Sequence, residues 1–266
     1  MHFFEAILRF LDTQMTQPTP YGWVHILSLV LTAAATVLLC RFGKKWDTRR
    51  VVLTTAIVVA VLEIYKQINF SFPYSDGIRF DYQWYAFPFQ FCSTPMYVGL
   101  LAGCLRQGKL HSSCYAYLAT YAVFAGVCVM FYPVTVFTPV VGINIQTMIC
   151  HGSMITIGIW LLYTGAVKLR HRTILKALPV FGVCVALAVC MNEIAHASGL
   201  LERETFDMFF ISPYGTPSLP VYSLVQGVVP FPWCLMIYVL AFTLAAYLVL
   251  LAAMGIHALA RKKVKV

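Results

Sequence analysis

The chain has 266 residues, a formal net charge of +9, 60% hydrophobic and only 11% charged side chains, and a mean hydropathy of +0.78. Soluble globular domains carry roughly 25% charged residues, so this composition excludes a soluble protein and indicates an integral membrane protein. The positive charge suits topology and contact with anionic lipids, and it gives no reason to expect a nucleic-acid partner.

The chain begins with a segment in which apolar residues surround Glu5, Arg9 and Asp12. This pattern predicts an amphipathic segment lying in the membrane interface over residues 1–14. Seven apolar stretches follow, each long enough to cross the hydrocarbon core as a helix. The predicted spans are Trp23–Cys40, Val51–Ile68, Tyr85–Leu105, Ser113–Val134, Ile145–Val167, Ile174–Ala197 and Trp233–Ala260. Because the chain shows no repeat or domain boundary, residues 1–266 are predicted to form one all-α domain, a polytopic bundle of seven transmembrane helices.

The basic residues predict how the bundle is oriented. Fifteen of the nineteen Lys and Arg residues fall in alternate connections, at Arg41–Arg50, Arg106–Lys109, Lys168–Lys176 and Arg261–Lys265. Short loops rich in Lys and Arg stay in the cytoplasm, so the N-terminus is predicted to be outside and the C-terminus in the cytoplasm. The protein is therefore expected to be a multi-pass protein of the cell membrane.

One outward connection, residues 200–232, is long, apolar and interrupted by five prolines and two glycines. Irregular backbone at membrane depth is tolerated only where protein or a cavity satisfies it. We therefore interpret this connection as a broken segment that covers part of the molecule, a candidate lid. The alternative is an ordinary interfacial loop anchored by aromatic side chains.

A few polar residues interrupt the predicted spans at about one depth. At a rise of about 1.5 Å per residue, four helices bring them to the outer third of the bilayer. Ionisable groups are costly in hydrocarbon, so a layer of them is a hypothesis for a functional site. The candidates are Glu63, Lys66, Cys92, His151, Asn192, Glu193 and His196.

Helical spacing relates some of these candidates to each other. Glu63 and Lys66 are three residues apart, share a helix face and can neutralise one another, and Glu193 and His196 repeat the arrangement. Each pair alone is more typical of a structural ion pair or a solvated helix end than of a catalytic site, and an isolated histidine such as His151 is as typical of a packing role as of a functional one. The hypothesis of a functional site therefore depends on the shared depth of residues from several helices.

A cysteine and a histidine at one depth favour nucleophilic catalysis. The imidazole takes the thiol proton, the thiolate attacks a carbonyl, and a thioester divides one acyl transfer into two easier steps. A carboxylate usually orients the histidine, and Lys66 or an amide can stabilise an oxyanion or bind a head group. Cys92, His151 and His196 with Glu63 or Glu193 are also zinc-ligand types, but no local ligand spacing supports a metal site. We predict neither a metal nor a soluble cofactor.

Several short motifs, taken in order, resemble a known family. They are Glu63-Ile-Tyr-Lys66, Pro88-Phe-Gln-Phe-Cys92, Ile149-Cys-His-Gly152, and Pro-Tyr-Gly and Pro-Trp segments before the last span. Over nearly its whole length the chain resembles the YwaF-like bacterial membrane proteins and their eukaryotic relative, transmembrane protein 164. The eukaryotic branch is regarded as a cysteine-dependent acyltransferase that remodels ether phospholipids.

The resemblance implies that Cys92 accepts the acyl group and that His151 is its base. Two positions depart from the family pattern. Ser93 stands where the eukaryotic branch has a histidine directly after the cysteine, and Gln90 where bacterial relatives often have one. The resemblance therefore does not fix the donor and acceptor lipids.

Three functional hypotheses follow. The first is a phospholipid acyltransferase or lipid hydrolase of the bacterial plasma membrane, with phospholipid and lysophospholipid substrates and an acyl-cysteine intermediate. The second is a non-enzymatic carrier or receptor that binds a small polar ligand through Glu63, Lys66, Glu193 and His196. The third is a structural subunit whose polar groups pair off completely and leave no cavity. The oligomeric state is left open.

Overall fold

A computed structural model describes residues 2–72, 79–199, 201, 206–215, 219, 222–226 and 228–263, and the regular elements in these ranges are helical. The α-helices are α1 (His2–Leu11), α2 (Trp23–Phe42), α3 (Thr48–Ser71), α4 (Thr94–Cys104), α5 (Lys109–Leu118), α6 (Tyr121–Phe131), α7 (Val141–Tyr163), α8 (Arg172–Ser198) and α9 (Phe231–Lys263). Short 3-10 turns are η1 (Gly43–Lys45), η2 (Trp84–Ala86), η3 (Phe91–Ser93), η4 (Met208–Phe210) and η5 (Tyr222–Leu224). The predicted all-α fold is confirmed. A helix, α1, forms in the segment predicted to be interfacial, and its position at the membrane surface stays a prediction.

Six helical units of the described chain are long and apolar enough to cross a membrane. They are α2 with η1, α3, α5 continued by α6, α7, α8 and α9. A multi-pass membrane protein is thereby confirmed. The orientation of its termini across the bilayer stays a prediction.

The third predicted span, Tyr85–Leu105, is not a membrane-length helix. The chain runs through η2, extended residues and η3 before α4 begins, and α4 has 11 residues. Eleven residues rise about 16 Å, roughly half of the hydrocarbon core. Pro88 lies in the irregular part, and because proline has no backbone N–H it does not support a continuous helix there. The described residues therefore give six full spans and one short apolar helix, and the predicted count of seven is not confirmed.

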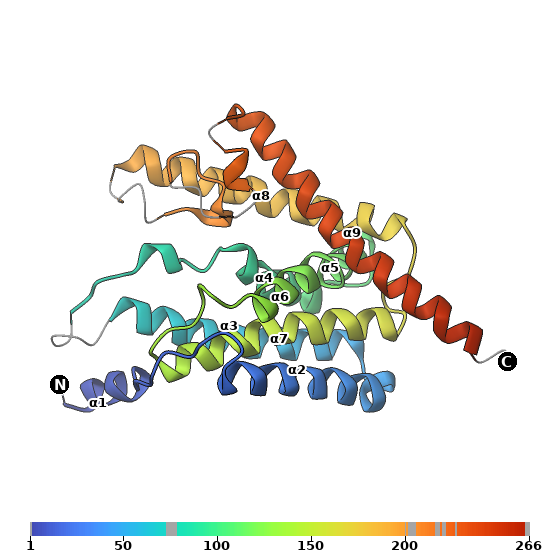
Figure 1. Ribbon diagram of the computed structural model, residues 1–266, viewed down its shortest axis with the longest axis horizontal. Coiled ribbons are helices and arrows are strands. Elements are labelled where there is room, and N and C mark those ends of the chain that lie inside the picture. The colour runs from blue at the N-terminus through green and yellow to red at the C-terminus, as the bar shows by residue number, and fades with distance from the viewer. Residues whose placement is uncertain are drawn as a thin grey trace.

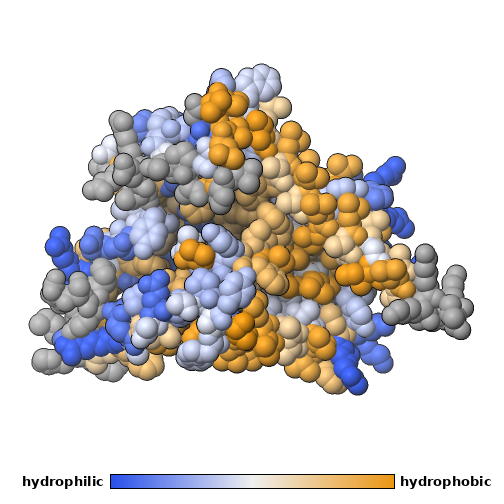
Figure 2. Space-filling view, in the orientation of Figure 1, coloured by the Kyte–Doolittle hydropathy of each residue, from blue (hydrophilic) through white to orange (hydrophobic). Residues whose placement is uncertain are grey.

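The helices alternate in direction, so their connections gather at two ends (Figure 1). We call the end that holds α1 the α1 end, and the opposite one, where α9 finishes, the C-terminal end. Helix α7 packs against α2, α3, α5 and α6, and α5 also packs against α8. Hydrophobic residues cover the middle of the visible face and hydrophilic ones gather toward its ends, as expected for a membrane protein (Figure 2).

Two glycines let helices approach closely. A Cβ atom on Gly126 of α6 would lie 2.7 Å from the carbonyl oxygen of His151 in α7, and one on Gly99 of α4 would lie 2.9 Å from the Cβ of Ala56 in α3. Real Cβ contacts are never this short, so a larger residue at either position would force the helices apart. Glycine at these positions therefore allows α6 to pack closely on α7 beside His151, and α4 to pack closely on α3.

Candidate functional site

A buried ion pair occupies the half of α3 toward the α1 end. The Nζ atom of Lys66 lies 2.7 Å from Oε1 of Glu63, and their side chains are 17% and 7% exposed. The predicted mutual neutralisation of these two residues is confirmed. Glu63 also accepts hydrogen bonds from Gln67 Nε2 at 2.8 Å and from Gln146 Nε2 at 3.2 Å. Since Gln146 belongs to α7, the carboxylate connects α3 to α7.

Gln67 extends this network toward the irregular segment that precedes α4. Its Nε2 atom donates to the main-chain oxygen of Ala86 at 2.9 Å, and the Tyr82 hydroxyl donates to its Oε1. Sequence reasoning missed both Gln67 and Gln146. Their signal was present, because each is an amide within an apolar helix close to the depth of Glu63.

Cys92 lies in η3, directly before α4, and is half-buried. From α7, the Sγ atom of Cys150 lies 3.9 Å from the main-chain oxygen of Cys92. Cys92 is thus held against α7 at the start of α4.

His151 is buried in α7 and has one nitrogen in use. Its Nδ1 atom lies 2.7 Å from the main-chain oxygen of Thr147. A carbonyl oxygen only accepts, so Nδ1 carries the proton and Nε2 holds a lone pair. This Nε2 atom is buried and has no hydrogen-bond partner within the described part of the chain. The group that orients the imidazole is a backbone carbonyl rather than the predicted carboxylate, because a helical histidine can reach the carbonyl four residues earlier.

His25 of α2 shows the contrasting arrangement. Its Nδ1 accepts the backbone N–H of Tyr21 at 2.8 Å, and its Nε2 lies 2.8 Å from the main-chain oxygen of Met130. Both ring nitrogens are therefore satisfied, and His25 fastens the start of α2 to the end of α6. A buried histidine with a free nitrogen, as at His151, has its lone pair available for chemistry.

Contacts bring four of the seven sequence candidates into one region. Cys150, which contacts Cys92, is the residue before His151, and Gln146 of the same helix donates to Glu63. Glu63 completes this group through its ion pair with Lys66. A direct hydrogen bond between Cys92 and His151 stays a prediction.

The three candidates on α8 bind the following connection instead. Asn192 Nδ2 donates to the main-chain oxygen of Met208 at 3.1 Å, and Met208 N donates to Asn192 Oδ1 at 2.8 Å. Glu193 Oε2 accepts the Tyr214 hydroxyl at 2.9 Å, and the ring of His196 stacks on Tyr214 with centroids 3.5 Å apart. These residues position the connection between α8 and α9.

Residues 206–215 of that connection lie against the segment that leads to Cys92. Gln90 Nε2 donates to the main-chain oxygen of Asp207 at 2.9 Å, and Phe209 N donates to Gln90 Oε1 at 3.0 Å. The Phe209 ring also contacts Phe91, with centroids 5.6 Å apart. Residues 200, 202–205, 216–218, 220–221 and 227 of the candidate lid lie outside the described residues, and its action as a lid stays a prediction.

Two features of residues 207–210 show that tertiary contacts hold this segment in place. Phe209 and Phe210 both have positive φ values, 64° and 56°. This left-handed region is unfavourable for bulky residues, so surrounding structure must impose it. Burial raises the pKa of the Asp207 carboxyl to about 6, although Ser212 N donates to its Oδ1 at 2.7 Å.

Comparison with known proteins identifies the family. No curated protein and no solved structure matches this sequence. The TMEM164 family model matches residues 20–252, which include all seven candidate site residues and every membrane-spanning helix in whole or in large part. The predicted relationship to transmembrane protein 164 is confirmed, whereas the narrower likeness to YwaF-like bacterial proteins stays a prediction. The chain belongs to the TMEM164 family.

Proposed function

We propose that this protein is a membrane-embedded phospholipid acyltransferase, or a lipid hydrolase of the same mechanism, that carries the acyl group on Cys92. In this proposal His151 is the general base and Lys66 stabilises negative charge. The substrates are a phospholipid acyl donor and a lysophospholipid or water as acceptor. The membrane is the cell membrane, with the α1 end facing outward.

The observation that carries the proposal is the state of His151. Its protonated Nδ1 is fixed by Thr147 and its lone pair on Nε2 is unused, which is the tautomer that a general base requires. An ammonium group near a thiol favours the thiolate, the reactive form of cysteine. In the proposal Lys66, which is paired with Glu63, is that ammonium group.

The first half-reaction forms a thioester. Nε2 of His151 takes the thiol proton of Cys92, and the thiolate attacks the ester carbonyl of the donor phospholipid. Negative charge develops on the carbonyl oxygen, where the Lys66 ammonium is the available stabilising group. When the tetrahedral intermediate collapses, the ester C–O bond breaks and the His151 imidazolium protonates the lysolipid alkoxide that leaves.

The second half-reaction releases the acyl group. A hydroxyl of a second lysolipid, or a water molecule, gives its proton to Nε2 of His151 and attacks the thioester carbonyl. The C–S bond breaks, and the sulfur recovers its proton from the imidazolium. The acceptor decides between transfer and hydrolysis, and the protein groups return to their starting protonation states.

The hydrogen bonds weigh against a purely structural role for the polar layer. Glu63, Lys66, Gln67 and Gln146 do form a connected network, as a structural subunit would require. His151 leaves this network incomplete, because its buried Nε2 has no partner among the described residues. An unsatisfied polar atom in a membrane interior is unfavourable, and in the proposal the thiol proton of Cys92 is the partner that satisfies it.

The decisive experiment traps the covalent intermediate. The full-length protein is incubated with a phospholipid that carries a labelled acyl chain, and the label should appear on Cys92 in a form that hydroxylamine removes. Cys92→Ser should abolish the label and turnover, whereas Cys128→Ser, at an exposed cysteine of α6, should retain both. A label that persists in folded Cys92→Ser protein would contradict the proposal.

A further inference from the structure

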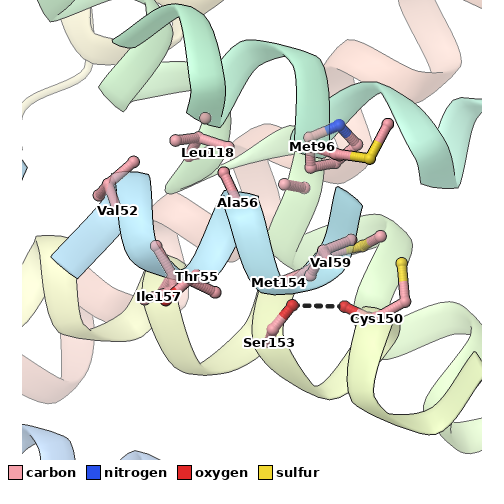
Figure 3. A pocket seen from close by; sticks show the side chains of 13 residues that line it. Val52, Thr55, Ala56, Val59, Met96, Leu118, Cys150, Ser153, Met154 and Ile157 are labelled. Carbon is pink, nitrogen blue, oxygen red and sulfur yellow. Dashed lines mark hydrogen bonds between the residues drawn. The ribbon is translucent and has the colours of Figure 1, made fainter. Parts of the chain in front are cut away.

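A small apolar cavity lies next to the candidate site, on its side toward the C-terminal end. Its volume is about 40 Å³, and it is enclosed by α3, α4, α7 and the α5–α6 unit (Figure 3). On α3 it is lined by Val52, Ala56 and Val59, and Val59 is one helical turn from Glu63. On α4 it is lined by Met96, which is four residues after Cys92. The cavity therefore begins about one helical turn from Glu63 on α3 and from Cys92 before α4.

Cys150 forms the end of the cavity nearest the site. It lines the cavity, and its Sγ atom is also the atom 3.9 Å from the main-chain oxygen of Cys92. The hydroxyl of Ser153 also faces this region, but it donates to the main-chain oxygen of Cys150 at 2.7 Å and is thereby satisfied. The cavity beside Cys150 thus offers mainly apolar contacts, which suits an apolar occupant.

A much larger groove begins on the other side of the cavity wall. It has a volume of about 1010 Å³ and lies between α2 and α3, which both pack on α7. Along α2 it extends from Trp23 to Leu39, and it ends beside Trp46 and Arg50. Thr55, Ser153 and Ile157 line both the groove and the cavity. A single layer of side chains therefore separates the two spaces.

We propose that the fatty acyl chain carried on Cys92 passes Cys150, fills the cavity and continues past Thr55, Ser153 and Ile157 into the groove. This inference rests on the proposed function and adds the substrate class, a long-chain acyl ester. The cavity alone is too small for such a chain, since even benzene occupies an engineered cavity of about 150 Å³. A long chain needs the groove, and only a chain as short as acetyl ends in the cavity.

The geometry gives Ala56 a role in selecting chain length. Ala56 is buried, and its Cβ projects into the cavity between Val52 and Val59 (Figure 3). A leucine at this position would fill the space that the distal part of a long chain must cross. A chain that ends before this point would be accommodated as in the unaltered protein.

The test measures acylation of Cys92 in the full chain with phosphatidylcholines that donate either an acetyl or an oleoyl group. Ala56→Leu should lower the oleoyl-to-acetyl ratio of rates by about tenfold or more, since contacts with single methylenes already discriminate to this degree. Ala34→Leu makes the same exchange at an exposed position of α2 outside the groove lining and should keep the original ratio. A folded Ala56→Leu protein with an unchanged ratio overturns the inference and leaves the proposed function standing.

A second measurement needs no substitution and serves where Ala56→Leu does not fold. A phosphatidylcholine with a photoreactive diazirine at the end of a long acyl chain is loaded onto Cys92 and illuminated. Cross-links should appear in groove residues of α2 or of α7, such as Leu31 or Ile149. An acyl-cysteine that cross-links only elsewhere would refute the inference alone, whereas absence of any acyl-cysteine would remove the proposed function first.

Discussion

The thiol of Cys150 lies 3.9 Å from the main-chain oxygen of Cys92, although the two residues are 58 positions apart in the chain. This contact predicts that mild oxidation with diamide joins the two thiols. Afterwards Cys92 should no longer react with a maleimide, and the linked peptides should be detected by mass spectrometry. In Cys150→Ala, diamide should leave the maleimide reaction of Cys92 unchanged. Equal loss of labelling in both proteins would argue against the proximity of these thiols.

Histidines 25 and 151 should respond differently to the same exchange. His151→Gln removes the proposed base and should slow thioester formation on Cys92 by about 10²- to 10⁴-fold with little loss of folded protein. His25→Gln cannot maintain the bonds to both Tyr21 and Met130 and should lower the free energy of unfolding by about 1–3 kcal/mol. Its acylation rate per folded molecule should stay near that of the unaltered protein. Acylation rates and thermal unfolding are measured on the same preparations. If His25→Gln slowed acylation and His151→Gln mainly lowered stability, His25 would be the base and His151 the structural residue.

Removing one charge of the Glu63–Lys66 pair should destabilise the protein more than removing both. Glu63→Gln leaves the largely buried Lys66 ammonium without its carboxylate and should cost about 3–5 kcal/mol. The double variant with Lys66→Met should regain most of this stability, because no unpaired charge remains. It should still acylate slowly, since Lys66 no longer favours the thiolate. A double variant that acylates Cys92 at the normal rate would contradict the role of Lys66 in the reaction.

The raised pKa of Asp207 predicts that the stability of the protein depends on pH. Burial raises the pKa of its carboxyl to about 6 from an ordinary value of 3.8, so the folded state binds the proton more tightly than the unfolded state. Its contribution to stability is complete below about pH 4 and is lost as the pH rises through about 6. Thermal unfolding followed between these values should therefore show a decline that Asp207→Asn reduces. An identical pH profile in the variant would assign the decline to other groups.

The predicted topology is tested by labelling from one side. Cysteines introduced at Thr13, after α1, and at Gln107, between α4 and α5, replace exposed residues. In sealed right-side-out vesicles, an impermeant maleimide should label the first position and reach the second only after permeabilisation. Labelling of both positions in intact vesicles would overturn the predicted orientation.

The sequence predicted the membrane depth of the polar residues better than the direction in which their side chains face. Depth follows from counting residues along a helix, so Glu63, Lys66, Cys92 and His151 could be grouped, and the Glu63–Lys66 pair followed from helical spacing. Which way each helix faces depends on tertiary packing. Asn192, Glu193 and His196 therefore share the depth of the site but contact Met208 and Tyr214.

Other features carried no distinguishing signal in the sequence. Cys150 is one of nine cysteines in a chain where most of them are apolar packing residues, and only the fold places it against Cys92. The shortness of α4 was missed because the residues from 85 to 105 are as apolar as a spanning helix. Hydropathy measures the preference of side chains for water or hydrocarbon. The backbone conformation of this segment is instead decided by its prolines and by its contacts with residues 207 and 209.

The two hydrogen bonds between Gln90 and residues 207 and 209 also determine when the site can be completed during synthesis. The irregular segment before Cys92 leaves the ribosome long before its partners, which are more than a hundred residues further along the chain. Domains generally fold as their residues emerge, yet this segment cannot satisfy its contacts until α8 and the following connection have been made. A chain truncated before residue 206 would hold Cys92 in an unfinished environment. The surroundings of the proposed nucleophile are thus assembled only as biosynthesis nears its end, after most of the bilayer-spanning helices are already in place.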